Sequence, residues 1–333
     1  SDGAWEPGTA VTISVNDPDA NKNPTSAETL AIGDETHVIP TIKMGSPLTL
    51  AASGINGAMA KGSTNSATGV VVGCGSDGTC SGTSIGYYTL SITNTTDNSE
   101  RLRIIHSASG GTGTATAAAT NTWINVTTGH TRATLVGLAG TVVLNYDVTG
   151  PCALVTCTSV KVYVTDAGSN DTSQMGTTGT INVVTGGNDQ AGVYNLDDGT
   201  TRITSADKYS GAARATFSGT GQTGAAFVTV NFLLTHGSLA STNLYNADYA
   251  IAADFCNFDQ NNGSLTHNCI YRLEAVETGA NTGIFEGTVE YINLVNSTAA
   301  AVGGTHSGND IDVAGKLGYV NGDALTVVLM DAV

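Results

Sequence analysis

Apolar and polar residues alternate along most of this chain with a period of two. The first clear run spans residues 9–15, where Val11, Ile13 and Val15 share one face and polar residues occupy the other. This period is typical of a half-buried β-strand. The same pattern predicts strands at Tyr87–Thr93, Leu102–His106, Trp123–Thr127, Thr141–Tyr146, Ser159–Thr165, Gly179–Val184, Ala225–Leu234, Tyr249–Asp254, Cys269–Val276, Gly283–Ile292 and Asp323–Met330.

The composition favours the same all-β class. The chain contains 50 Thr, 42 Gly, 26 Asn and 25 Ser, and only 12% of its residues are charged, against roughly 25% in an average soluble protein. Thr fits a pleated surface, whereas Gly, Asn and Ser suit turns. The charged residues that commonly cover the solvent face of a helix are scarce. Many short strands with turns between them predict β-sandwiches.

A weak internal repeat suggests two modules. The segment 8–17 resembles the segment 322–331, and a shorter copy lies at 140–147; each is a Gly-led apolar strand that ends on Asp. Residues 166–178 are polar and lack apolar alternation. We therefore expect two tandem immunoglobulin-like β-sandwich modules, 1–170 and 171–333.

The charge balance restricts the partners. The formal net charge is −16 and the pI is about 4.4. Such an acidic chain repels phosphate backbones, so we expect no nucleic-acid binding, and it favours cations. No apolar run reaches the roughly 18 residues of a membrane span, so we expect none.

Six cysteines fall into three close pairs, and none of the pairs has the spacing of a zinc or redox motif. Close pairs of this kind predict local disulfides and an oxidising, extracellular compartment. The predicted bridges are Cys74–Cys80, Cys152–Cys157 and Cys256–Cys269.

Glycosylation sequons permit attachment of glycans but do not demonstrate it, because a chain rich in Asn, Ser and Thr contains them by chance. The candidate positions are Asn94, Asn125, Asn170, Asn262 and Asn296.

The best candidate for a metal site follows the first strand. Side chains with oxygen ligands stand there at near-alternate positions, as in a calcium loop. They are Asp17, Asp19, Asn21, Asn23 and Glu28. Lys22 occupies the turn position at which such loops need Gly, so an Asx-type turn preset by Pro18 is the alternative. Weaker acidic clusters are Asn309, Asp310 and Asp312, and Asp254, Asp259 and Asn261.

No motif predicts an enzyme. Residues 82–86 fit the nucleophile pattern G-x-S-x-G, and residues 219–224 fit the dinucleotide pattern G-x-G-x-x-G. Both are followed by predicted strands instead of the helix that each chemistry requires. We therefore predict a protein without catalytic activity.

Two segments resemble a known family. Tyr271–Tyr291 contains Glu-Thr-Gly at 277–279, Asn-Thr-Gly at 281–283 and Phe-Glu-Gly at 285–287. It resembles a hairpin in the immunoglobulin-like modules of archaeal S-layer proteins, notably those of ammonia-oxidising archaea. Residues 7–23 are similar to the strand and turn that begin such modules. The resemblance implies a secreted, glycosylatable lattice protein assisted by divalent cations, a role that falls on Asp17 and Asp19 by position. The shorter length and the local disulfides depart from that family.

Together these features predict a structural, self-assembling subunit of a surface filament or an S-layer lattice. Its partners would be copies of itself, joined through edge or terminal strands such as Thr9–Val15 and Asp323–Met330. A secreted adhesin or carbohydrate-binding module is the alternative.

Overall fold

The computed structural model describes residues 10–34, 39–50, 58–61, 87–91, 101–106, 121–139, 141–165, 180–184, 186–196, 208–209, 227–237, 249–259, 266–290, 293–296 and 311–314. These residues form mainly β-strands in sheets that are antiparallel except for the parallel pairs β5–β7 and β6–β8, with two short α-helices. The all-β prediction is confirmed. In this part of the chain, no helix has the length and the apolar character needed to cross a membrane.

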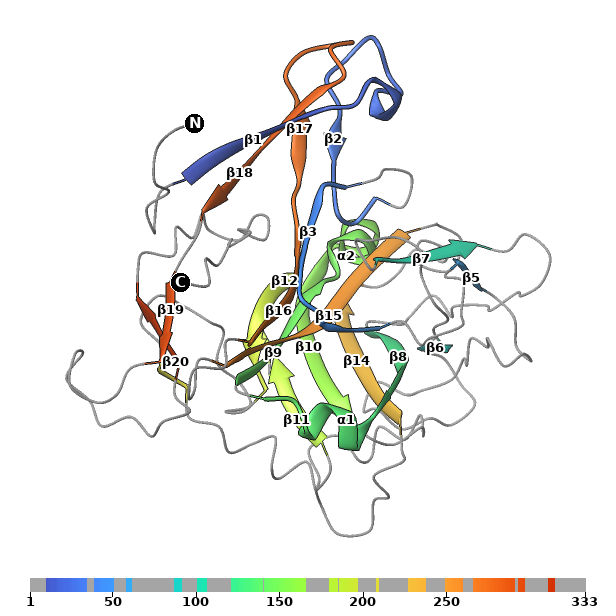
Figure 1. Ribbon diagram of the computed structural model, residues 1–333. Coiled ribbons are helices and arrows are strands. Elements are labelled where there is room, and N and C mark those ends of the chain that lie inside the picture. The colour runs from blue at the N-terminus through green and yellow to red at the C-terminus, as the bar shows by residue number, and fades with distance from the viewer. Residues whose placement is uncertain are drawn as a thin grey trace.

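Two large sheets form the body of the protein (Figure 1). The first has the order β11 (Thr180–Val184), β10 (Cys157–Thr165), β14 (Phe227–His236), β8 (Asn121–Thr131) and β6 (Tyr87–Ser91). The second has the order β12 (Ala191–Asn195), β9 (Thr141–Asp147), β15 (Tyr249–Asp259), β16 (Thr266–Arg272) and β3 (Thr41–Met44). Further pairs add β4 (Leu48–Thr49) and β7 (Arg101–His106) to β15, and β5 (Ala58–Lys61) to β7.

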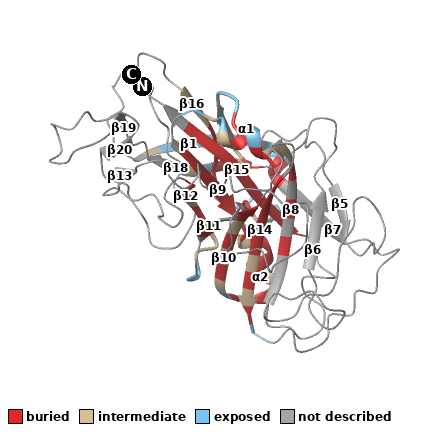
Figure 2. Cartoon of the chain, turned by 90° about the horizontal axis from the view of Figure 1, so that it is seen from below, coloured by how far each residue is buried: buried red, intermediate tan, exposed pale blue. Residues whose placement is uncertain are grey.

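The apolar faces of these two sheets share one core, so together they form a sandwich. Every second residue of β14 from Val228 to Leu234 is buried, as is every second residue of β15 from Tyr249 to Phe255, and all belong to one cluster. The period-two pattern of the sequence is the cause, because alternate side chains of a strand point to the same face. Figure 2 shows the buried residues concentrated on these strands and on β9 and β10.

A smaller sheet stands beyond one end of the sandwich, and we call it the arm sheet (Figure 1). Its order is β1 (Ala10–Asn16), β18 (Ile284–Glu290), β17 (Ala275–Glu277) and β2 (Thr29–Leu30). Leu30 and Phe285 anchor a second small core, which Ala252 of β15 also joins. Elsewhere, β13 (Lys208–Tyr209), β20 (Ile311–Ala314) and β19 (Asn293–Asn296) form a three-stranded sheet.

The sequence pattern did not indicate the helices α1 (Arg132–Val136) and α2 (Thr149–Val155). Their five and seven residues are too few to show an apolar period. Local capping defines both instead. The side chain of Thr131 accepts a hydrogen bond from the backbone N–H of Thr134 at the start of α1. Thr156, with φ of 55°, ends α2 in the left-handed conformation.

Each predicted strand coincides with an observed strand over its described residues, to within a few residues at the ends. Cys269–Val276 is divided between β16 and β17, which belong to different sheets. Asp323–Met330 lies outside the described residues.

The sheets join segments from both predicted modules. β10 pairs with β11 and β14, β9 pairs with β12 and β15, and β1 pairs with β18, so all five pairings cross residue 170. The division into 1–170 and 171–333 therefore has no support in these pairings. Tandem immunoglobulin-like modules stay a prediction.

Candidate functional site

Two of the three predicted disulfides, Cys152–Cys157 and Cys256–Cys269, are present. Cys152–Cys157 joins the last turn of α2 to the first residue of β10. Cys256–Cys269 joins the neighbouring strands β15 and β16. Cys74 and Cys80 lie outside the described residues.

The Cys256–Cys269 bridge lies where β15 and β16 separate. The two strands pair from Asp259↔Thr266 to Asn257↔Asn268, and the cysteines are the next opposed residues. Beyond the bridge, β15 pairs with β4 and β16 pairs with β3. The disulfide therefore fixes the point at which β16 separates from β15, which we call the fork, before the chain continues to β17 of the arm sheet.

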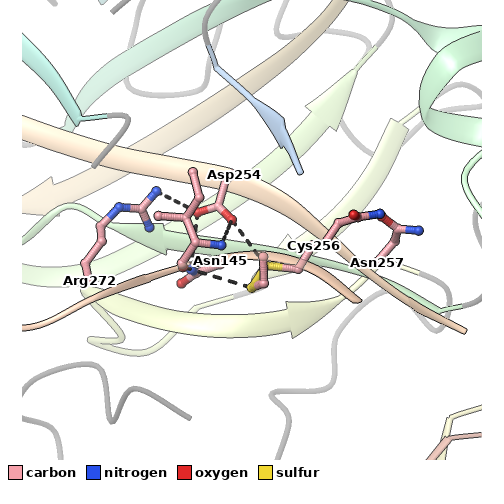
Figure 3. Close-up of a disulfide and its surroundings, with 8 residues drawn as sticks. Asn145, Asp254, Cys256, Asn257 and Arg272 are labelled. Carbon is pink, nitrogen blue, oxygen red and sulfur yellow. Dashed lines mark hydrogen bonds and ion pairs between the residues drawn. A yellow bond between two sulfur atoms is a disulfide. The ribbon is translucent and has the colours of Figure 1, made fainter. Parts of the chain in front are cut away.

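Buried polar side chains occupy the gap between the separated strands (Figure 3). The guanidinium of Arg272 lies 2.6 Å from Oδ1 of Asp254, and both side chains are fully buried. Oδ2 of Asp254 accepts from the backbone N–H of Ile270 at 3.3 Å, and Nδ2 of Asn145 donates to the Ile270 carbonyl at 2.8 Å. Asn145 also donates to Asp254 at 3.2 Å. These side chains satisfy backbone groups that would be costly to bury without partners.

This cluster contains the only described trio of His, Cys, Asp or Glu side chains whose potential ligand atoms lie within 4.8 Å of one another. The trio is Asp254, Cys256 and Cys269. Its chemistry does not suit a metal ion, because both sulfurs are in the disulfide and the carboxylate is paired with Arg272. The group therefore holds the strands together, and Asp254 is not available as the calcium ligand that the sequence suggested.

Two more buried charges connect the sandwich to the chain near the arm sheet. Burial raises the pKa of Asp147, while hydrogen bonds from Thr149 and the charges of Arg272 and Arg101 oppose that rise. The Arg101 guanidinium donates to the carbonyls of Ile32 and Asp34 at 3.0 and 2.6 Å. Arg101 thus ties the chain after β2 to the sandwich, and the positive charges of Arg101 and Arg272 lie close enough to Asp147 to favour its ionised form.

The predicted calcium ligands after β1 accept hydrogen bonds within their own turn. Oδ1 of Asp17 accepts from the backbone N–H of Asp19 at 3.1 Å, which is the Asx-type turn of the alternative interpretation. Oδ1 of Asn23 accepts from Thr25, and Oε2 of Glu28 accepts from the Lys22 N–H at 2.5 Å.

The predicted calcium ligands do not bring three carboxylates together in the described structure. Asn21 donates its side-chain amide to Asn281 at 3.1 Å. Asp17, Asp19 and Glu28 do not form a carboxylate trio within 4.8 Å in the described structure. Calcium binding at this turn stays a prediction.

A buried glutamate connects this turn to the hairpin between β17 and β18. Oε1 of Glu277 accepts from the backbone N–H groups of Gly283 and Thr282, both at 2.8 Å, and Oε2 accepts from Glu28 at 3.3 Å. The hydrogen bonds from Gly283, Thr282 and Glu28 lower the pKa of Glu277. Sequence reasoning singled out the hairpin but not this role of the carboxylate.

Gly283 completes the connection. Its φ of 61° suits glycine, and a Cβ there would lie 2.8 Å from Cα of Pro18. Its carbonyl accepts from the Asp17 N–H at 2.8 Å. We call residues 17–28 and 277–284 together the turn clamp. The two segments that carry the family resemblance therefore contact each other.

The strand β1 is an edge of the arm sheet. It pairs with β18 over seven positions, from Ala10↔Glu290 to Asn16↔Ile284, and with no other described strand. Its apolar residues Val11, Ile13 and Val15 are half-buried, and its polar residues are exposed. Val276 in β17 is the one exposed large apolar residue of the described structure, at 52%.

The structure describes two of the predicted glycosylation positions. Asn125 lies in the middle of β8, opposite Asn231, which is buried. Asn296 is the last residue of β19. Asn94, Asn170 and Asn262 lie outside the described residues, as do Asn309, Asp310 and Asn261 of the weaker acidic clusters.

No protein-family model matches the sequence, and no curated protein matches it. The resemblance to archaeal S-layer modules therefore stays a prediction from the quoted residues.

Proposed function

We propose that this protein is a non-catalytic structural subunit of an extracellular polymer, a surface filament or an S-layer lattice, built from copies of itself. The observation that supports the proposal best is the edge strand β1. It stands in a sheet beyond the sandwich and pairs on one side only in the described structure.

An edge strand offers unpaired backbone N–H and C=O groups to another strand. Proteins that remain monomeric commonly protect such edges with charges, bulges or prolines. The seven residues of β1 include no charge and no proline, and their pairing with β18 shows no bulge. The half-buried Val11, Ile13 and Val15 leave apolar surface beside this edge, which favours association with another copy.

The disulfides and the charge of the chain are compatible with an extracellular protein. The two disulfides fix the start of β10 and the point at which β15 and β16 separate, and such bonds persist in an oxidising environment. A net charge of −16 makes copies repel one another at low ionic strength. Divalent cations would reduce that repulsion, and calcium at the turn of Asp17 and Asp19 is part of the proposal. The sequons would carry glycans in the same setting.

Sedimentation velocity of the purified chain over a range of concentrations tests this function. We expect large assemblies to form without any added ligand and to increase with calcium. Ile13→Lys places a charge on the apolar side of β1 and should abolish them. Val276→Lys places the same charge on an exposed residue of β17 and is the matched control. A chain that stays monomeric at all concentrations would contradict the proposal and favour the adhesin or carbohydrate-binding alternative.

A further inference from the structure

We propose that β1 is an exchangeable strand, which pairs with β18 of a second copy of this chain when the protein polymerises. This inference rests on the proposed function and specifies how the copies are joined. It starts from the way in which β1 is attached to its own copy.

β1 adds no residue to either hydrophobic core of the described structure. The sandwich core and the small core under the arm sheet both exclude Val11, Ile13 and Val15. Phe285 of β18 is fully buried in the small core, so β18 is anchored independently of β1. In the described structure, β1 is therefore attached through its seven pairs with β18, where Val15 lies opposite Phe285, and it adds no member to either core.

The turn clamp would keep the rest of the arm sheet in place during exchange. Asn21 bonds to Asn281, and Glu277 bonds to the backbone N–H of Glu28, so the chain after Pro18 is tied to the β17–β18 hairpin. A strand that leaves at Asn16 would thus detach from a fixed point. The position on β18 that it leaves is then open to the β1 of a neighbour.

The residue at the hinge favours an extended strand in both states. Asp17 has φ of −140° and ψ of 90°, and it precedes Pro18. A residue before proline is disfavoured in the helical region and prefers extended conformations. The backbone of Asp17 is therefore extended both when β1 lies on its own β18 and when it lies on the β18 of a second copy.

The occupant is β1 itself, because the structure shows it seated on β18 in complementary register. Exchange recreates the same seven pairs between copies, so it changes few contacts. If each copy gives its β1 to the next, the contact is head-to-tail, and it produces a filament when the rotation between copies does not close a ring.

Disulfide trapping across the β1–β18 pair tests the exchange. Ser14 and Glu286 are opposed in register, and both are exposed. A Ser14→Cys chain mixed with a Glu286→Cys chain should give polymers in which the two chains are covalently joined. The matched control is the pair Thr29 and Val276, opposed and exposed in β2 and β17. Mixed Thr29→Cys and Val276→Cys chains should not be joined, because these strands stay within one copy.

The doubly substituted chains give the second readout. Ser14→Cys with Glu286→Cys in one chain should lock β1 on its own β18 and abolish polymers, whereas Thr29→Cys with Val276→Cys should polymerise like the unmodified protein. If the unmodified protein polymerises while the locked chain also polymerises and the mixed chains are not joined, the exchange is refuted and the proposed function stands. That outcome is expected if copies are joined instead by the predicted strand Asp323–Met330 of one copy adding to the outer edge of β1 in the next. Closed dimers alone would refute the head-to-tail arrangement, and an unmodified protein that never assembles would refute both proposals.

Discussion

Replacing Arg272 by Met should severely destabilise the fold. Arg272 is the charge partner of Asp254 at 2.6 Å, and neither side chain is exposed to water. Met keeps much of the apolar volume but removes the positive charge, so Asp254 is left buried without its ion-pair partner, although it keeps the bonds from Asn145 and Ile270 at 3.2 and 3.3 Å. The carboxyl of Asp147 also loses a favourable charge, because Arg272 opposes the rise of its pKa.

Removing one partner of a buried ion pair costs about 3–5 kcal/mol, and we expect Arg272→Met to lower the free energy of unfolding by that amount. Replacing both partners, as Arg272→Met with Asp254→Asn, removes the unpaired charge. The double variant should therefore be more stable than Arg272→Met alone.

Urea denaturation with the disulfides intact measures these differences, since the free energy of unfolding falls linearly with urea. Lys161→Met, on the half-buried β10 position, is the control and should change stability by less than about 0.5 kcal/mol. If Arg272→Met costs less than about 1 kcal/mol, or the double variant is less stable than the single one, the ion pair does not hold β15 and β16 in place where they separate.

Three further predictions concern the bridges and the turn clamp. The chain-entropy model assigns a stabilisation of about 3 kcal/mol to Cys256–Cys269, whose sequence separation is 13, and about 2 kcal/mol to Cys152–Cys157, whose separation is 5. Replacing both cysteines of a bridge by Ser should therefore lower the urea midpoint more for Cys256–Cys269. Equal losses would contradict this. The pKa of Glu277 is lowered in the folded state, so its contribution to the stability of the fold is present above about pH 4.5 and is lost as the pH falls through the folded pKa. Glu277→Gln should therefore flatten the acid side of a plot of Tm against pH. An unchanged slope would contradict the role of Glu277 in the turn clamp. Gly283→Ala should cost at least about 1 kcal/mol in a thermal melt because of its positive φ and the proline beside it, whereas Gly279→Ala, with its nearest neighbour at 3.5 Å, should be near neutral.

Many of the strands were predictable because their signal is local, although short strands such as β3 and β12 were not among those predicted. Alternation along residues 9–15 or 159–165 reports that one face of the strand is buried and the other is not. Which strands pair is not a local property. β1 pairs with β18, which is far away in the sequence, and neither segment contains a pattern that identifies the other as its partner. The predicted boundary at residue 170 therefore followed sequence order, whereas the sheets follow spatial order.

The candidate site was predictable only in part. Closely spaced cysteines indicated two bridges that are present, because short loops bring such pairs within reach. The charge partner of Asp254 could not be read from the sequence, since Arg272 and Asn145 approach it from two other strands. The role of Glu277 could not be predicted for a different reason. Backbone N–H groups bind its carboxylate, and nearly every residue has such a group, so the sequence does not indicate which ones it binds.

Electron microscopy of the purified native protein, in calcium and in a calcium chelator, tests self-assembly most directly. We predict ordered filaments or sheets in calcium and their dissolution by the chelator, because calcium at the turn around Asp17 is part of the proposal. Monodisperse single particles under both conditions would contradict self-assembly as the role of this protein.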